Sequence, residues 1–326
     1  MSSQGKTSVT RVPVKPTWRQ RILAAGAWSL LALTLAGSCG AWYWAFDLCA
    51  HFRWYYFVAS LIWAIAIWKR YRSPAMCCLI ISLFWNGGLL LPYYVPVKQS
   101  SHPDPEKSLS LISLNVYTAN PNKADVVAYL RARQPDLIVV MEVDEPWERA
   151  LDELKDDYPH RFIQPRHDNF GIGLLSKWPL QGERFVKFSD TDLPNIVATI
   201  DHRGSAFQLV ATHPLPPIGA GYTRKRNAQL RELADFVKKS PLPSIVAGDF
   251  NATPWSSAFR EFVSRSQLRD SGMGRGVQGS WNAKSRLIRI PIDHVFVPQN
   301  VTVVRRVLGP DIGSDHYPVE ATIELP

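Results

Sequence analysis

Residues 245–251 read Ile-Val-Ala-Gly-Asp-Phe-Asn, an apolar run that stops abruptly at two polar side chains, Asp249 and Asn251. The run is rich in β-forming residues, and Pro243 and Pro254 stand on either side of it, so the stretch predicts a short buried strand. Asp249 and Asn251 then lie on the loop at the end of the strand, where they can converge on one small charged target. An Asx turn that only ends the strand is the simpler interpretation of the same residues.

The same pattern, an apolar run that ends on a polar residue, recurs through the C-terminal part of the chain. The runs cover residues 109–114, 137–141, 207–212, 245–248, 288–292 and 308–314. The polar residues at or near their ends are Asn115, Glu142, His213, Asp249, Asn251, Asp293, Asp315 and His316. Helical candidates lie between the runs, at residues 123–134, 145–157, 223–239 and 255–266. Strands that alternate with helices predict a sheet-rich α/β sandwich flanked by helices.

The charges of the chain are unevenly distributed. Residues 1–100 contain 10 Lys and Arg residues and a single acid, Asp47, whereas residues 101–326 contain 27 basic and 27 acidic residues. The whole net charge of +9 therefore belongs to the N-terminal part, and the high isoelectric point does not indicate a polyanion-binding surface on the rest. All four cysteines also lie in residues 1–100, which excludes a disulfide framework or a Cys-based zinc site in the C-terminal part.

Three stretches of the N-terminal part are apolar enough to predict transmembrane helices. They lie at about residues 22–46, 48–68 and 74–97, and Trp and Tyr residues cluster near their ends, as in the interfacial belts of membrane proteins. The second stretch is marginal, because one crossing needs about 20 apolar residues. Asn86 is the one polar spot in the third stretch. It predicts a contact between packed helices, with a functional group inside the membrane as the alternative.

Basic residues predict the orientation of these helices. Five Lys and Arg residues lie in the tail formed by residues 1–21, and three more lie at residues 69–72. This tail is therefore predicted to be cytoplasmic, and three crossings place the C-terminal part outside the bacterial inner (cytoplasmic) membrane, in the periplasm of a Gram-negative cell. A competing interpretation makes residues 1–39 a signal peptide with a lipidated Cys39, but it leaves the later apolar stretches unexplained.

A polar linker at residues 98–108 leads into the domain at residues 109–326, where the polar set includes four carboxylates, two amides and two histidines. Oxygen-rich ligands suit a hard cation, Mg²⁺ or Mn²⁺. No nucleophile motif and no phosphate-binding Gly-rich loop is visible. The favoured chemistry is metal-assisted attack of water on phosphorus beside a carboxylate-oriented histidine. Each residue alone is more typical of an ordinary strand end or turn than of a catalytic site, but six such ends in one domain are hard to obtain by chance.

The ordered series resembles the endonuclease/exonuclease/phosphatase superfamily, the DNase I-like proteins that include nucleases, neutral sphingomyelinases and inositol-polyphosphate 5-phosphatases. The segments that carry the resemblance are Ser-Leu-Asn at 113–115, Val-Met-Glu at 140–142, Ala-Thr-His at 211–213, Gly-Asp-Phe-Asn at 248–251, Ile-Asp-His at 292–294 and Gly-Ser-Asp-His-Tyr-Pro at 313–318. Residues 168–179 and Ser-Trp at 280–281 are further similar to the bacterial, often membrane-anchored YafD-type branch. The resemblance implies a four-layer sandwich of two packed β-sheets flanked by helices, here preceded by three transmembrane helices.

The resemblance also implies roles for the matched residues. One group is expected to hold the metal or its waters, with Glu142 as the principal ligand: Asn115, Glu142 and Asp315. A second group is expected to activate water and bind the phosphoryl group: His213, Asp249, Asn251, Asp293 and His316. Asp249 and His316 share the general-base role, because the families differ on this point. Four residues are candidates for substrate contacts, with a hairpin turn and a solvated helix start as the alternatives: Asn169, Phe170, Arg224 and Arg226.

The predicted function is therefore that of a membrane-anchored, Mg²⁺-dependent phosphodiesterase or phosphatase. We expect a lipid-linked phosphoester as substrate, because the bilayer tether holds the site near lipid headgroups. A DNase I-like nuclease is the alternative, although a formally neutral domain does not favour the basic track that nucleic acid requires. A non-catalytic envelope scaffold is the third hypothesis, and no missing site residue supports it. No protein partner is evident in the sequence.

Overall fold

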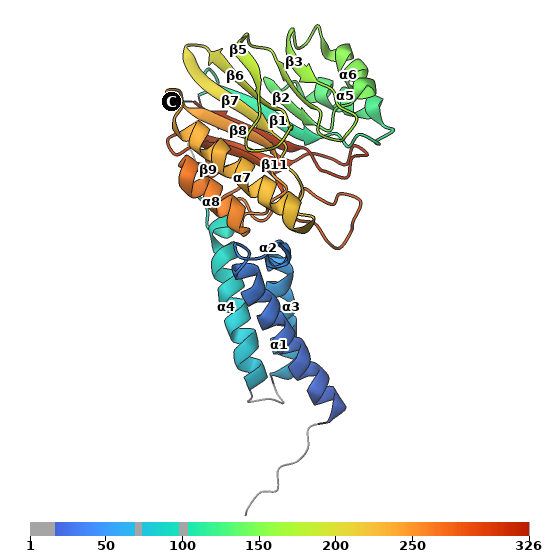
Figure 1. Ribbon diagram of the computed structural model, residues 1–326, viewed down its shortest axis with the longest axis vertical. Helices are drawn as coiled ribbons and strands as arrows, with labels where there is room; N and C mark the ends of the chain where they lie inside the picture. Colours follow the sequence, from blue (N-terminus) through green and yellow to red (C-terminus); the bar gives the residue numbers. More distant parts are fainter. Residues whose placement is uncertain (1–16, 69–73, 98–103, 326) are drawn as a thin grey trace, which may run out of the picture.

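The computed structural model describes residues 17–68, 74–97 and 104–325. These residues form a bundle of N-terminal helices, which stands like a stalk below a larger two-sheet domain (Figure 1). Residues 1–16 of the predicted cytoplasmic tail, the basic loop at 69–73 and residues 98–103 of the predicted linker lie outside the described residues, as does residue 326.

The bundle contains four helices of unequal length. They are α1 (Trp18–Ser38), α2 (Trp44–Ala50), α3 (Arg53–Ile67) and α4 (Pro74–Tyr94). Of these, α1 and α4 are long and apolar enough to cross a membrane, whereas α3 is a shorter apolar helix of 15 residues. The prediction of three transmembrane helices is therefore supported for two helices and not for the third.

The sequence predicts one continuous helix at residues 22–46, but the structure divides this apolar run between two helices. The chain leaves the helical path at Cys39, turns through residues 40–43 and starts again as α2. Gly37 allows this return, since a Cβ atom there would lie 2.8 Å from the backbone nitrogen of Ala50. The short helix α2 therefore packs directly across the end of α1.

A polar network occupies the interior of the bundle. Arg53 is fully buried and donates hydrogen bonds to the carbonyl oxygen of Thr34 (2.6 Å), to Asn86 Oδ1 (3.3 Å) and to Ser38 Oγ (3.1 Å). Asn86 Nδ2 donates to Thr34 Oγ1 (2.9 Å) and to the carbonyl oxygen of Ser82 (2.8 Å), so Asn86 makes the predicted helix-packing contact. The large apolar side chains that are more than half exposed on these helices are Trp18, Ile22, Trp28, Ile62, Ile65, Phe84, Leu91 and Tyr94.

Two six-stranded sheets of mixed direction make up the core of the larger domain. The first sheet has the order β11-β12-β1-β2-β4-β3. Its strands are β1 (Ser108–Asn115), β2 (Leu137–Met141), β3 (His160–Gln164), β4 (Ile172–Ser176), β11 (Thr302–Leu308) and β12 (Val319–Glu324). The second sheet has the order β5-β6-β7-β8-β10-β9. Its strands are β5 (Leu180–Val186), β6 (Asn195–His202), β7 (Ser205–Thr212), β8 (Ser244–Asp249), β9 (Leu268–Asp270) and β10 (Asp293–Pro298).

Helices cover the outer face of each sheet, and apolar side chains fill the space between the sheets. Helices α5 (Lys123–Arg133) and α6 (Glu145–Leu151), with the short 3-10 helix η1 (Asp152–Leu154), lie on the first sheet, and α7 (Gly219–Lys238) and α8 (Ser257–Ser266) lie on the second (Figure 1). The layer between the sheets is aliphatic, with side chains such as those of Val139, Leu174, Leu209 and Ala247. This arrangement confirms the predicted sandwich of two packed sheets flanked by helices.

Two of the apolar runs do not form the strands that the sequence suggested. Residues 288–292 are irregular apart from a single bridge between Ile290 and Trp281, and Pro291 in this run has no N–H for a ladder. The run at 308–314 belongs to a strand only at Leu308, where β11 ends, because Gly309 and Pro310 follow. Both runs instead form loops that lead into the site.

Candidate active site

The predicted site residues come together at one edge of the sandwich, where strands of both sheets end. Asn115 is the last residue of β1, Glu142 directly follows β2, His213 directly follows β7, and Asp249 is the last residue of β8. Strands β1 and β2 are parallel, and so are β7 and β8, so the carboxyl ends of each pair lie at the same edge of their sheet. Asp293 begins the antiparallel strand β10 and stands opposite Asp249 in the register, so it reaches the same place.

Steric crowding explains why a glycine precedes Asp249 in the Gly-Asp-Phe-Asn segment. Gly248 has a φ of +151°, and a Cβ atom there would lie 1.9 Å from the carbonyl oxygen of Thr212 on the paired strand. Any side chain would therefore push β8 away from β7 and displace Asp249. Beyond the strand, Asp249 Oδ1 accepts a hydrogen bond from the backbone N–H of Asn251 (2.8 Å), so the Asx turn is real and also orients the two side chains.

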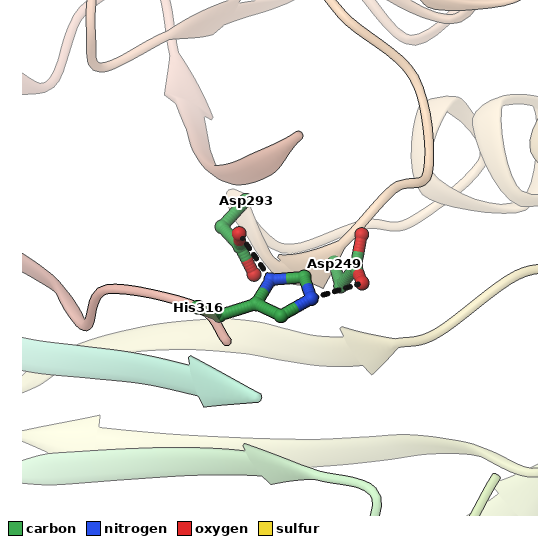
Figure 2. A group of neighbouring side chains, drawn as sticks. All are labelled: Asp249, Asp293 and His316. Atoms are coloured by element: carbon green, nitrogen blue, oxygen red, sulfur yellow. Dashed lines mark hydrogen bonds and ion pairs between the residues drawn. The ribbon is translucent and has the colours of Figure 1, made fainter. Parts of the chain in front are cut away.

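Asp249, Asp293 and His316 form a buried group in which the histidine lies between the two carboxylates (Figure 2). His316 Nδ1 lies 2.8 Å from Asp293 Oδ2, and His316 Nε2 lies 3.7 Å from Asp249 Oδ2. Burial lowers the pKa of His316, but the charges of Asp293 and Asp249 outweigh burial and raise this pKa to about 10. Burial and the charge of Asp293 raise the pKa of Asp249 to about 7. The group is therefore arranged to hold and transfer protons.

Glu142 faces this group from the first sheet and has an unusual backbone conformation. Its φ is +62°, in the left-handed region, which costs on the order of 1–3 kcal/mol for a residue with a side chain. Thr118 holds this conformation, because its Oγ1 donates to the carbonyl oxygen of Glu142 (2.9 Å) and its backbone N–H donates to Glu142 Oε2 (3.2 Å). Asn115 Nδ2 donates to Glu142 Oε1 (3.0 Å) and to Asp249 Oδ2 (3.4 Å), so it connects the two carboxylates.

The donor atoms around Glu142 fit a divalent cation. Burial raises the pKa of Glu142 above its usual value, so its charged form needs compensation. Asp315 Oδ2 accepts a hydrogen bond from Trp281 Nε1 (3.1 Å), but Asp315 Oδ1 is buried without a partner. A buried carboxylate oxygen left in this state is a natural ligand for a metal.

One possible ligand atom from each of Asp249, Asp293 and His316, a carboxylate oxygen or a ring nitrogen, lies within 4.8 Å of the other two, close enough to hold a metal ion. However, His316 Nδ1 is already committed to Asp293 at 2.8 Å. The oxygen-rich side of the site around Glu142 therefore fits a hard cation better than the histidine group does.

A cavity of about 520 Å³ opens over these residues. Asn169 and Phe170 line it, as predicted for substrate contacts, and the ring of Phe170 lies 5.1 Å from that of His213. The other two candidates are not among its lining residues. Arg224 is exposed, and Arg226 is fully buried below the loop that carries Asn251.

Some residues of the site did not emerge from the sequence as site residues. Trp281, which binds Asp315, belongs to the Ser-Trp pair noted above, so a signal was present. Thr118, which holds Glu142, had no signal beyond its place after a strand. Leu48, His51 and Phe52 line the cavity from the helical bundle, and no spacing in the sequence connects them with residues so far along the chain.

Two packed mixed sheets with a carboxylate and histidine site at the strand ends define the DNase I-like class of phosphoester hydrolases. Residues 112–316 match the Endonuclease/Exonuclease/phosphatase family, and the chain belongs to this family. Its members are hydrolases that act on phosphoester bonds, and they are generally dependent on divalent metals. The matched region begins after the helical bundle.

Individual relatives are distant. Phospholipase C of Staphylococcus aureus is 22% identical over 229 residues, which are 56% of this chain and 68% of that protein. The structure of D. rerio TDP2 complexed with single strand DNA product is 21% identical, has a TM-score of 0.55, and covers 67% of this chain and 99% of its own. Sphingomyelinase C from Streptomyces griseocarneus is 18% identical, has a TM-score of 0.53, and covers 66% and 99% of the two chains. At these identities the structural likeness establishes the fold.

Proposed function

We propose that the chain is a membrane-anchored, Mg²⁺-dependent phosphoester hydrolase that acts on phospholipids or other lipid-linked phosphoesters. The observation that carries the lipid preference is the position of the cavity. Its lining combines the polar site residues with apolar residues of both the two-sheet domain and the bundle, among them Leu48, Phe52, Phe170 and Ile218. A phosphoester with an apolar part fits such a cavity.

The bundle has polar side chains in its interior and apolar side chains on its outside, and this distribution supports a membrane anchor. Its interior contains the hydrogen-bonded side chains of Arg53 and Asn86, whereas Phe84 on its outside is 80% exposed. This distribution is expected of helices in hydrocarbon rather than in water. The two-sheet domain lies at the end of the bundle opposite to the start of α1 (Figure 1). With a cytoplasmic N-terminus, the site is then periplasmic.

A loop beside the cavity supports a lipid substrate as well. Leu287 and Ile288 are 84% and 50% exposed, and the loop also contains the exposed cations Lys284, Arg286 and Arg289. The hydroxyl group of Tyr55, near the start of α3, donates to the carbonyl oxygen of Arg289 (2.9 Å), so the loop lies next to the bundle. Exposed aliphatic residues among cations are typical of segments that bind the surface of an anionic bilayer.

In this proposal Asn115, Glu142 and Asp315 hold Mg²⁺, and the same oxygen donors also suit Mn²⁺. When bound, the cation polarises a phosphoryl oxygen and neutralises the charge that develops there.

The proton transfers are assigned to Asp249 and His316 jointly. Ionised Asp249 accepts a proton from the water whose oxygen bonds to phosphorus. Protonated His316, whose Nδ1–H is held by Asp293, gives its Nε2 proton to the alcohol oxygen as the bond from phosphorus to that oxygen breaks. The proton on Asp249 then returns to His316 Nε2, 3.7 Å away. Asn251 binds the phosphate. His213 Nε2 lies 3.6 Å from Asp249 Oδ2, and burial together with the charge of His316 lowers the pKa of His213 to about 3, so it acts as a neutral wall of the site.

A nuclease is the second candidate, because D. rerio TDP2 with its DNA product has the same fold. The exposed cations at Lys284, Arg286 and Arg289 are the residues that a nucleic-acid backbone would contact.

The test uses the purified full chain in detergent micelles. Headgroup release from phospholipids is compared with cleavage of single-stranded DNA, each with Mg²⁺ and with EDTA, for the wild type, Glu142→Gln and His316→Ala. We expect Mg²⁺-dependent hydrolysis of lipid that both substitutions abolish. Activity that survives both substitutions would overturn the site assignment, faster cleavage of DNA would establish the nuclease, and no activity on either substrate would favour the scaffold hypothesis.

A further inference from the structure

Residues 44–52, which form most of the connection between α1 and α3, belong to the bundle in the chain but contact the active site in space. We propose that this segment is a working part of that site. Asp47 of α2 is a positioning residue for the phosphate-binding loop, and Leu48 and Phe52 form the wall that receives the apolar part of a substrate. The proposal rests on the proposed function and names residues outside the family match.

A buried chain of contacts connects Asp47 with the site. Asp47 and Arg226 are both fully buried, and Arg226 Nη2 lies 2.5 Å from Asp47 Oδ2. The other arm of the guanidinium, Nη1, donates to the backbone carbonyl oxygen of Asn251 (2.8 Å). Asn251 has a left-handed backbone, with a φ of +48°. Because a buried guanidinium needs a carboxylate partner, Asp47 fixes Arg226, and Arg226 in turn fixes the strained residue that binds phosphate.

The same segment contacts this loop at a second point. His51 Nδ1 lies 3.0 Å from Thr253 Oγ1, and the backbone N–H of Thr253 points to the same nitrogen at 3.4 Å. The loop after β8 is thus held at Asn251 through Arg226 and at Thr253 directly. Two contacts from one short segment determine the position of the loop more strongly than either contact alone.

The wall of the cavity is the second part of the argument. Leu48, His51 and Phe52 line the cavity together with catalytic residues such as Glu142 and His316. Apolar side chains from the two-sheet domain complete this side: Phe170, Ile218, Tyr222 and Ile290. Burial of an apolar chain here would remove its surface from water, which favours binding. A contact that served only to dock the bundle would not need residues inside the substrate cavity.

Other contacts between the bundle and the two-sheet domain provide a control. Tyr93 of α4 donates its hydroxyl to Asp270 Oδ2 (3.0 Å), and Trp255 Nε1 donates to the carbonyl oxygen of Leu89 (3.2 Å). None of these four residues lines the cavity. Removing such a contact weakens the docking of the bundle without touching the site.

The positioning role is tested with Asp47→Asn in the full chain, on a soluble phosphodiester, bis(4-nitrophenyl) phosphate. We expect kcat to fall about a hundredfold with little change in KM, because the misplacement of a binding group by about 1 Å has an effect of this size. Asp47→Glu should restore part of the loss. The control Tyr93→Phe should leave kcat unchanged. Equal effects of Asp47→Asn and Tyr93→Phe, or a kcat for Asp47→Asn like that of the wild type, would overturn the positioning role.

The wall is tested with Phe52→Ala, whose side chain is only partly buried, so the fold should tolerate the change. We expect KM for a long-chain phospholipid in mixed micelles to rise about tenfold, while KM for bis(4-nitrophenyl) phosphate stays the same. The control is Phe46→Ala on the neighbouring helix α2, since Phe46 is 38% exposed and does not line the cavity. An unchanged ratio of the two KM values refutes the wall. A wild-type protein that hydrolyses neither substrate instead overturns the proposed function itself.

Discussion

Two buried polar clusters of this protein, the network inside the bundle and the catalytic group, differ in how fully their atoms are paired. In the bundle, Asn86 uses both its oxygen and its nitrogen, and among the described side chains of that network Arg53 Nε is the atom without a partner. At the site, Asp293 Oδ1, Asp315 Oδ1 and His213 Nδ1 are all buried without one.

The difference distinguishes two uses of buried polarity. A network whose groups satisfy one another holds helices in register and needs no ligand. A cluster that leaves carboxylate oxygens unpaired is costly unless something binds there. The share of buried polar atoms that have hydrogen-bond partners, more than burial or charge, therefore distinguishes the network in the bundle from the cluster at the site. Four substitutions test this distinction.

The largest effect is expected for Glu142→Gln. Loss of the charge of the proposed principal metal ligand should lower kcat/KM about a thousandfold, which corresponds to about 4 kcal/mol of transition-state stabilisation. The unfolding temperature without metal should not fall, because burial already raises the pKa of Glu142 and a neutral amide avoids that penalty. Kinetics and thermal unfolding in EDTA check both parts. Glu145→Gln, at an exposed carboxylate nearby, is the matched control, and a marked loss of stability in Glu142→Gln would place this residue in the structural class.

Asp293→Asn should come next and should change the pH profile. The proposed mechanism needs ionised Asp249 and protonated His316, so the rate should rise as the pH passes about 7 and fall as it passes about 10. The charge of Asp293 raises both pKa values, so its removal should move both limbs of kcat/KM to lower pH. At pH 8 we expect a loss of about tenfold to a hundredfold. A profile that keeps its wild-type limbs would show that Asp293 does not act through these two groups.

Asn86→Leu should have the opposite signature. It removes hydrogen bonds to Thr34, Ser82 and Arg53, which should lower the stability of the bundle by about 1–3 kcal/mol. The kcat of the folded protein should stay within about twofold of the wild type, because Asn86 does not line the catalytic cavity. Denaturant unfolding in detergent and a kinetic assay measure the two quantities. Phe84→Leu, on the exposed face of the same helix, is the control. A large loss of kcat in Asn86→Leu would contradict the assignment of this network to structure.

The smallest effect is expected for Phe170→Leu. The substitution keeps an apolar wall but removes a ring 5.1 Å from His213, so KM should rise about threefold while kcat holds. Arg224→Ala should change neither constant, because Arg224 is exposed and does not line the cavity. Steady-state kinetics on both variants would show whether Phe170 contacts the substrate and whether Arg224 does not.

The sequence predicted the two-sheet domain well because its motifs and its strands coincide. The stretch around Gly248 forms a buried strand, and the close approach of the neighbouring strand at Gly248 requires a glycine there. The sequence pattern and the packing of the two strands therefore identify the same residues. The runs at 288–292 and 308–314 misled, since hydrophobicity alone does not register that Pro291 and Pro310 cannot donate to a ladder.

The residues that the sequence did not assign are those whose roles depend on long-range packing. Arg226 looked like a phosphate ligand at a helix start, but its partner is Asp47, 179 positions away along the chain. Leu48 and Phe52 read as part of a membrane segment and line the catalytic cavity. Periodicity and motif spacing carry no information about such pairs, because each partner obeys the local pattern of its own element.

The length of α3 has a consequence for the lipid around the protein. Its 15 residues rise about 22 Å at 1.5 Å per residue, whereas the hydrocarbon core of a bilayer is about 30 Å thick. In the proposed membrane position of the bundle, local thinning would accommodate this short helix and would bring the two layers of headgroups closer together around it. The outer headgroups would then approach the mouth of the cavity, so the deformation of the bilayer would itself assist in presenting a substrate.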